Sequence, residues 1–368
     1  MKVLYISGII LFFYYIYKNY KSNNLISDVK TLWTKYHPKD VLDKEVLKVM
    51  LENDTKIFKN LYEYYSIYDI NKITDFLNKY YSIKNPKQQN PNQVFLENKM
   101  KWLYNTPHQQ FNTIKHLPRN TWNIGLKQNN KLISLICIRP IKTMVCGIIM
   151  NSFWIDYECI HIQHRKNKIG SQLALKAIEE VVNSDFDNLF YIIDNRRYVQ
   201  PHITEIKYYT YNLSKVKVKY NDLSLFQPSD LKNTFKLYLE LIQKKKIYQL
   251  LTVNEFIYYF KPNNEFIYTF VSKKTISLIH IQCMEYKGYY IKIPIISLFL
   301  SKGNQHKELK KVMVQLRNLG FKNVIIMNTY KINRFKKKKY EGLSYIYNFN
   351  IKTKFKKIKA RDFGIPIF

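Results

Sequence analysis

The string KLISLICI at residues 131–138 decides the fold, because nearly the same string, KTISLIHI, returns at residues 274–281. Both strings have the apolar character of a buried strand. Each is followed by a second apolar strand, by a segment with apolar residues at helical spacing, and by another short strand. The same order of four elements, found twice, predicts a duplicated unit. Chance similarity between Ile- and Leu-rich strands is the alternative.

The expected elements occupy matching places in the two units. They are strands at 153–162 and 189–193 around a helix at 170–182, then strands at 290–299 and 324–327 around a helix at 306–319. Helical patterns also precede each sheet, around 73–77 and within 230–244. The expected fold class is therefore α/β (α+β), with two mixed sheets flanked by helices.

Composition supports a folded protein with a strongly basic surface. The chain has 368 residues, of which 46% are hydrophobic, and this is enough for two packed cores. Its 60 Lys and Arg residues against 27 Asp and Glu residues give a net charge of +33. Such a surface attracts nucleic acid, lipid headgroups or a phosphorylated cofactor. A bias toward residues with AT-rich codons is the bland explanation of the charge.

Cysteine spacing does not indicate a metal site. Cys137, Cys146, Cys159 and Cys283 form no C-x-x-C pair and have no zinc-ligand spacing with His. Because most of them stand in apolar runs, we expect buried thiols in a reducing compartment and no bound metal.

The N-terminus reads as a separate segment. Residues 3–17 are uncharged and mostly apolar between Lys2 and Lys18, and the span extends to residue 20 if Lys18 snorkels. An aromatic and basic border follows, which favours a membrane anchor within residues 1–22 and a cytoplasmic body. A cleaved signal peptide or a buried first helix is the alternative.

A basic turn joins strand to helix in the first unit. The segment CIHIQHRKNKIGS at 159–171 leaves an apolar strand and opens the predicted helix. The free N–H groups of a helix N-terminus suit a phosphate, and Arg165, Lys166 and Lys168 add full charges. Gly170 permits close backbone approach and Ser171 can cap the helix or bind phosphate. This pattern predicts a pyrophosphate site, against the alternative of a solvated turn.

These residues carry a resemblance to a known family. RKNKIG at 165–170 resembles the R-x-x-G-x-G/A coenzyme A loop of the GNAT acyltransferases, with Lys168 where the central Gly usually stands. The longer segment from residue 156 is similar to N-F-L-C-V-H-K-K-L-R-S-K-R-L-A of the N-myristoyltransferases. LWTKYHP at 32–38, KYYTYNL at 207–213 and YIYNF at 345–349 resemble further motifs of that family in the same order.

The resemblance spans roughly residues 30–368, but the chain departs from the family pattern at two further places. The T-A-G segment before the family's Pro is replaced by DNR at 194–196, and the G-D-G loop before Y-L-Y-N-W is missing. A lysine run at 336–339 stands in that region. Since that loop helps to read the peptide, the departures leave the peptide preference open.

The resemblance implies a glycylpeptide N-tetradecanoyltransferase, which moves myristate from myristoyl-CoA to the N-terminal glycine of a protein. It implies two GNAT-like halves, 30–218 for acyl-CoA and 219–368 for peptide, working as a monomer without a permanent cofactor. By position, the backbone amides of Tyr157 and Glu158 are the oxyanion donors. The implied coenzyme-binding residues are Trp33, His161, Arg165, Lys166, Asn167, Lys168, Ile169, Gly170 and Ser171.

The resemblance also implies that the base is the carboxylate of Phe368. The sequence ends DFGIPIF at 362–368, apolar to its last residue. An end threaded into the interior would raise the carboxylate pKa by desolvation and make it a better base. The alternative is an exposed apolar tail or an edge strand. The Glu158 side chain is a rival base, as in some GNAT enzymes, unless it only points outward.

Two other classes of function stay open. One is a GNAT-type N-acetyltransferase that uses acetyl-CoA and does not depend on the last residue. The other is a non-catalytic basic protein that binds membranes or nucleic acid. No nucleic-acid-binding module is recognisable in the sequence, so we expect no specific nucleic-acid partner.

Overall fold

The structure is a computed structural model. It describes residues 44–45, 48–49, 63–81, 92–104, 123–165, 169–194, 202–218, 220–263, 265–286, 288–330, 339–350 and 357–368. The predicted N-terminal anchor lies outside these residues, as do Trp33, Lys166, Asn167 and Lys168. No helix within the described ranges is both long and apolar enough to cross a membrane.

The first half is built on an antiparallel hairpin, a helix and a parallel strand. Its strands are β1 (Glu63–Ser66), β3 (Ile124–Gln128), β4 (Lys131–Val145), β5 (Ile148–Ile160), β6 (Asn188–Asp194) and β7 (Thr204–Asn212), and its main helix is α5 (Ile169–Asn183). β4 and β5 pair antiparallel, and β6 lies parallel to β5. The helical stripe expected from the sequence is buried in α5, at Leu173, Ala177, Ile178 and Val181.

The second half repeats this order. Its strands are β8 (Ser224–Leu225), β10 (Ile267–Val271), β11 (Thr275–Tyr286), β12 (Tyr289–Ser301), β13 (Asn323–Met327) and β14 (Lys339–Asn350), and its helices are α6 (Leu231–Ile242), α7 (Val253–Phe260) and α8 (Gln305–Asn318). β11 and β12 pair antiparallel, α8 follows, and β13 lies parallel to β12. The predicted duplicated fold with mixed sheets and flanking helices is therefore confirmed.

Both hairpins contain a bulge at the same structural position. In the first half the register shifts so that Asp156 has no partner on β4, and in the second half Ser297 has none on β11. In both halves the parallel pairing ends immediately before the bulge, at Ile155 and at Ile296. The bulges show that Ile138 corresponds to Ile279, so the similar strings match with a shift of two residues. An even shift keeps every side chain on its own face of the sheet.

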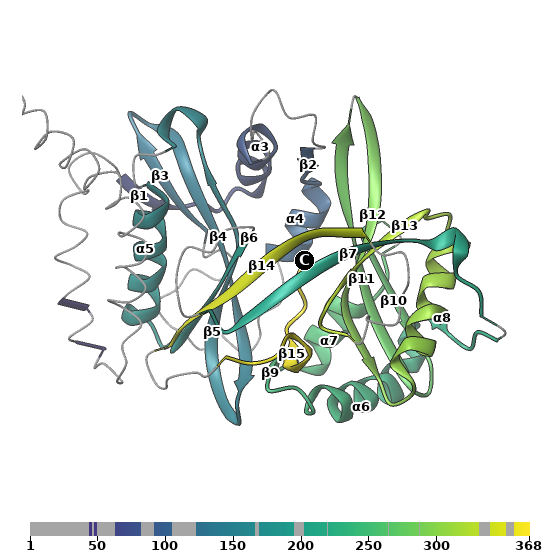
Figure 1. Cartoon of the computed structure of the whole chain (residues 1–368). Helices are drawn as coiled ribbons and strands as arrows, with labels where there is room; N and C mark the ends of the chain where they lie inside the picture. The colour runs from purple at the N-terminus through teal and green to yellow at the C-terminus, as the bar shows by residue number, and fades with distance from the viewer. Residues whose placement is uncertain are drawn as a thin grey trace, which may run out of the picture.

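Two strands join the halves into one sheet. Its order is β1-β3-β4-β5-β6-β14-β7-β13-β12-β11-β10-β8. β14, from the end of the chain, lies between β6 and β7, while β7 pairs with β13. These two long strands run side by side across the middle of the molecule (Figure 1). The halves thus share strands, and a boundary at residues 218–219 stays a prediction.

Four short elements complete the region between the halves. Helices α3 (Ile70–Tyr80) and α4 (Glu97–Tyr104) enclose β2 (Asn92–Val94), and β2 pairs with β11 of the second half. Strand β9 (Ile247–Gln249) pairs with β4 of the first half. Each element therefore carries backbone hydrogen bonds or packing from one half to the other.

The end of the chain runs into the molecule. β15 (Phe363–Gly364) pairs parallel with β9. A Cβ at residue 364 would lie 2.9 Å from Ile242 Cδ1 and 3.3 Å from Tyr248 Cβ, so Gly364 permits close packing here. Ile365 and Phe368 are buried. Figure 1 shows the C-terminus in the interior, near α4 and the strands that cross between the halves.

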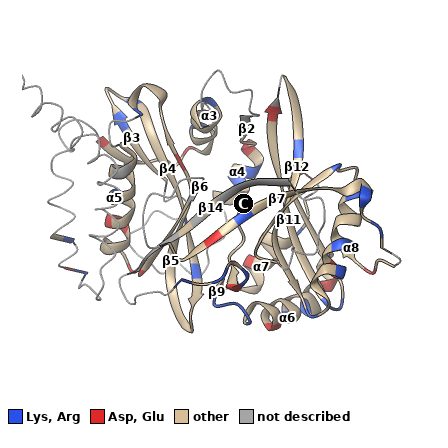
Figure 2. Ribbon diagram, viewed as in Figure 1, with Lys and Arg blue, Asp and Glu red and all other residues tan. Residues whose placement is uncertain are grey.

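Basic side chains are distributed over both halves. Figure 2 shows Lys and Arg on α8, around α6 and on several strands, with fewer acidic residues among them. In the described part of the chain, the basic residues seen in this view lie on several elements of both halves.

Candidate active site at the end of the chain

The side chain of Phe368 lies in a cage made by both halves. Its ring centroid is 5.1 Å from that of Trp102 on α4, 5.7 Å from Tyr259 on α7 and 6.2 Å from His280 on β11. The Arg139 guanidinium carbon on β4 lies 5.4 Å from the same centroid. We call Trp102, Arg139, Tyr259 and His280 the Phe368 cage. Only 8% of Phe368 is exposed, so the cage holds the residue out of water.

A buried ion pair forms one wall of the cage. Arg139 donates from Nε to Asp156 Oδ2 at 2.8 Å and from Nη2 to Oδ1 at 3.1 Å. The two side chains are 0% and 2% exposed. Tyr104 Oη donates to the same carboxylate at 3.4 Å. Burial by itself would lower the pKa of Arg139, but Asp156 outweighs that effect and raises it, so the guanidinium stays charged.

The second half has a neutral pair at the equivalent place. His280 Nδ1 hydrogen-bonds Ser297 Oγ, and these residues correspond to Arg139 and Asp156 by the position of the bulges. Burial, together with nearby Lys99, holds the pKa of His280 well below its usual value. His280 is therefore neutral at physiological pH, and of these two equivalent pairs only the first carries charge.

Tyr157 connects the bulge to the last residue. Its hydroxyl donates to the main-chain oxygen of Phe368 at 3.3 Å. Burial raises the pKa of Tyr157 well above its ordinary value, so the hydroxyl keeps its proton. Neighbouring residues of a regular strand face opposite sides, but the bulge at Asp156 lets Asp156 reach Arg139 while Tyr157 reaches Phe368.

Glu158 is oriented toward helix α5. Tyr191 Oη on β6 donates to its carboxylate, and a side-chain carbon added at Gly170 would collide with that carboxylate. Burial raises the pKa of Glu158 to about 7, although the Tyr191 hydrogen bond opposes this. The carboxyl thus lies where β5 and β6 cease to pair, beside the start of α5, and not beside Phe368.

The start of α5 retains the features of an anion site. It has no acidic residue in its first turn, which contains Ile169, Gly170 and Ser171. Ile169 is buried, and it fixes the helix against the sheet. The N–H groups of such a turn attract a phosphate.

Two of the predicted coenzyme residues have partners in the protein. Arg165 donates from Nε to the carbonyl of Ile160 at 3.0 Å and from Nη2 to the carbonyl of Tyr80. His161 lies against the Tyr80 ring, with 4.3 Å between centroids. Both residues therefore brace the turn before α5 against α3, which positions the backbone of that turn.

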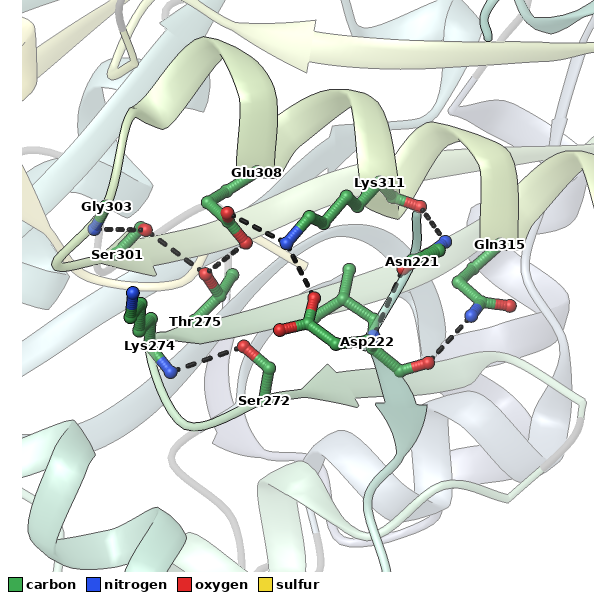
Figure 3. A network of polar contacts seen from close by, with 11 residues as sticks. Asn221, Asp222, Ser272, Lys274, Thr275, Ser301, Gly303, Glu308, Lys311 and Gln315 are labelled. Atoms are coloured by element: carbon green, nitrogen blue, oxygen red, sulfur yellow. Dashed lines mark hydrogen bonds and ion pairs between the residues drawn. The ribbon is translucent and has the colours of Figure 1, made fainter. Parts of the chain in front are cut away.

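The equivalent helix end in the second half is filled by the protein's own side chains. Glu308, in the first turn of α8, accepts from Thr275 at 3.1 Å and pairs with Lys311 at 3.0 Å (Figure 3). Lys311 also pairs with Asp222 at 2.6 Å, and Asn304 caps the helix. The charged Glu308 at this position disfavours a second anion. The carboxyl beside the α5 end, that of Glu158, is kept more neutral by its raised pKa, so the geometry favours the α5 end as the anion site.

Sequence reasoning missed the cage residues. Trp102 and Tyr259 have no motif around them, and the repeated string that contains His280 gives no sign of a contact with Phe368. All three meet Phe368 only through folding. Arg139 and Asp156 did leave a signal, because each is a charge directly flanked by apolar residues within an apolar strand. A buried charge requires a partner, so a pair between those two strands was predictable.

Comparison with known proteins supports the fold. The chain matches no family model and no curated sequence. Among solved structures it is similar to Saccharomyces cerevisiae N-myristoyltransferase with bound myristoyl-CoA and inhibitors, at 15% identity and a TM-score of 0.71 over 92% of this chain and 95% of that one. A second structure of the yeast enzyme with myristoyl-CoA gives 14% identity and a TM-score of 0.67 over 82% and 81%. This chain therefore has the duplicated GNAT-like fold that is also found in the N-myristoyltransferases.

Proposed function

We propose that this protein is an acyl-CoA N-acyltransferase that moves myristate from myristoyl-CoA to the N-terminal glycine of a protein. The observation that carries the proposal is the burial of Phe368 beside Tyr157, at the bulge of β5. The resemblance of motifs and the fold shared with the yeast enzyme support it. The proposal assigns acyl-CoA to residues 30–218 and peptide to residues 219–368, in a monomer, with residues 3–20 as a membrane anchor.

The proposed chemistry uses three groups of this chain. The carboxylate of Phe368 takes a proton from the glycine ammonium and frees the amine to attack the thioester carbonyl. The backbone amides of Tyr157 and Glu158 donate to the oxyanion that forms. When that intermediate collapses, the carbon–sulfur bond breaks, and the second proton that the attacking nitrogen must lose passes to the leaving sulfur, so that coenzyme A leaves as the thiol. Phe368 returns its own proton to solvent. Net, an amide forms and a thioester is lost.

The coenzyme would be held at the start of α5. We propose that the basic residues Arg165, Lys166 and Lys168 and the N–H groups around Gly170 bind its pyrophosphate. Asn167, Ile169 and Ser171 belong to the same turn, and Trp33 and His161 complete the proposed set. The carboxyl group of Glu158, which lies next to Gly170, would be close to the entering donor.

The test extends the chain beyond Phe368. Two added glycines would displace the carboxylate from the cage, and removal of Ile367 and Phe368 would move it back to Pro366 and empty the cage. Both variants, incubated with myristoyl-CoA and a Gly-initiated peptide, should show at least a 100-fold lower rate of acyl-peptide formation by mass spectrometry. Binding of myristoyl-CoA, measured by calorimetry, should persist. Full activity in the extended protein would rule out the carboxylate as base.

A second candidate function rests on Glu158. A carboxyl group with a pKa of about 7 suits general-base catalysis at neutral pH, as expected of an N-acetyltransferase that uses acetyl-CoA. Under this alternative, Glu158→Gln abolishes transfer while the extension after Phe368 is harmless. Under the myristoyl transfer proposed above, the outcomes are reversed, and a series of acyl-CoAs from acetyl to myristoyl identifies the donor.

A further inference from the structure

We propose that Arg139, held in place by Asp156, is the residue that positions Phe368, and that it acts through the face of the Phe368 ring. The chain therefore requires an aromatic side chain at residue 368. We call the contact of the Arg139 guanidinium with the Phe368 ring the clamp. Its effect on catalysis rests on the proposed function, but the contact itself is a property of the fold. In this role Arg139 is a positioning residue, because it would act on the terminal carboxylate only through the ring.

The first argument is geometric. The Asp156 carboxylate holds the guanidinium by two hydrogen bonds, at 2.8 and 3.1 Å, which fixes the plane of the group. The guanidinium carbon then lies 5.4 Å from the centroid of the Phe368 ring. A cation within about 6 Å of a ring centroid is attracted by the ring, and the attraction grows when both groups leave water.

The burial of the charged Arg139 is unfavourable for stability. Arg139 is 0% exposed, and its Nη1 has no hydrogen-bond partner among the described residues. A buried ion pair generally adds less stability than apolar residues of the same volume would. A strand position inside an apolar run would therefore be filled more stably by Ile or Met. A specific function of the charge explains its presence, and the face of Phe368 is the feature beside it.

The two duplicated halves differ in charge beside the Phe368 ring. The equivalent pair, His280 with Ser297, is neutral and touches the same ring from the other half at 6.2 Å. The ring thus lies between one charged and one neutral wall, while Trp102 and Tyr259 close the remaining sides. With the ring fixed, the main-chain oxygen of Phe368 is held at Tyr157 Oη.

A first experiment tests the clamp without any acyl transfer. Carboxypeptidase is added to the folded protein, and release of residue 368 is followed by mass spectrometry. The variant Arg139→Met/Asp156→Asn removes both charges and leaves no unpaired ion. It should release Phe368 at least 10-fold faster than the parent. When Phe368→Leu is added to the parent and to this variant, Leu should be released from both proteins at the same rate. Equal release of Phe368 from parent and variant would overturn the clamp.

A remote ion pair supplies the matched control. Lys311→Met breaks a pair in the second half whose side chains are 7% and 8% exposed, far along the chain from the cage. It is expected to lower stability without changing release of Phe368 under conditions in which the protein stays folded. If Lys311→Met releases Phe368 as fast as the Arg139 variant does, the effect reflects general loosening and the inference fails.

A second experiment measures the coupling in the proposed reaction. Arg139→Met/Asp156→Asn and Phe368→Leu should each lower kcat, with KM for myristoyl-CoA unchanged. In the combined variant, the fall in kcat should be about 2- to 30-fold smaller than the product of the two separate falls, because both changes remove the same cation–π contact. Phe368→Tyr should lower kcat less than Phe368→Leu does, because its ring can keep the contact with Arg139. Multiplicative effects, or full activity in Phe368→Leu, would overturn the positioning role.

The two experiments separate the possible failures. If neither the parent nor any variant transfers an acyl group, but release of Phe368 still depends on Arg139, the proposed function fails and the clamp stands. If acyl transfer is robust while release and kcat ignore Arg139, the inference fails and the proposed function stands.

Discussion

Replacement of Glu158 by Gln should make the protein more stable at neutral and alkaline pH. The folded protein raises the pKa of this carboxyl from 4.5 to about 7, mainly by burial. Between those two values the folded state binds more protons than the unfolded state, so the parent protein loses stability as the pH rises from 4.5 to 7. A shift of about 2.5 units at 1.36 kcal/mol each corresponds to about 3 kcal/mol.

Urea denaturation at a series of pH values from 4 to 8.5 measures this effect. The free energies of unfolding of parent and Glu158→Gln should agree near pH 4, where the carboxyl is neutral in both states. The variant should gain on the parent up to pH 7 and then keep a constant lead of about 3 kcal/mol. Glu97→Gln, at a side chain 47% exposed on α4, is the control and should follow the parent. Parallel curves for parent and Glu158→Gln would refute the reasoning.

Two other predictions concern buried positions. Burial lowers the pKa of Lys99 to about 8. Lys99→Met should therefore raise the free energy of unfolding by about 3 kcal/mol at pH 7, and this difference from the parent should shrink as the pH rises from 8 toward 10.5. A difference that does not shrink would argue against the prediction. Leu173→Ala in α5 should cost about 2–5 kcal/mol in urea denaturation because its side chain is fully buried, whereas Leu319→Ala, 47% exposed, should cost under about 0.5 kcal/mol. Equal losses for the two leucines would contradict the packing of α5.

Much of the fold was predictable because it depends on local patterns. The helix expected at 170–182 is α5, and the one expected at 306–319 is α8, each within one residue at either end. The strand at 131–138 extends in the structure to Val145, because an apolar hairpin continues through Pro140. Local periodicity reveals such elements, since it reports which face of each segment is buried.

The candidate site was predictable only in part. The basic turn before α5 and the apolar end at Phe368 follow from residue types in sequence, and their motifs pointed to them. The face of the sheet on which Asp156 and Tyr157 lie depends on a bulge, and a one-residue bulge has no signature in this composition. The role of Arg165 as a brace to Tyr80 also required the positions of two separate elements.

The sequence by itself determined the duplication, the amphipathic helices and the apolar character of the last residues, because each is written in the order of neighbouring side chains. Only the tertiary structure decided that β14 lies between β6 and β7, and that Phe368 meets Arg139 and His280. Those contacts join residues far apart in the chain. Their geometry depends on how the strands of the two halves pair and bend within one sheet, and no local pattern encodes that.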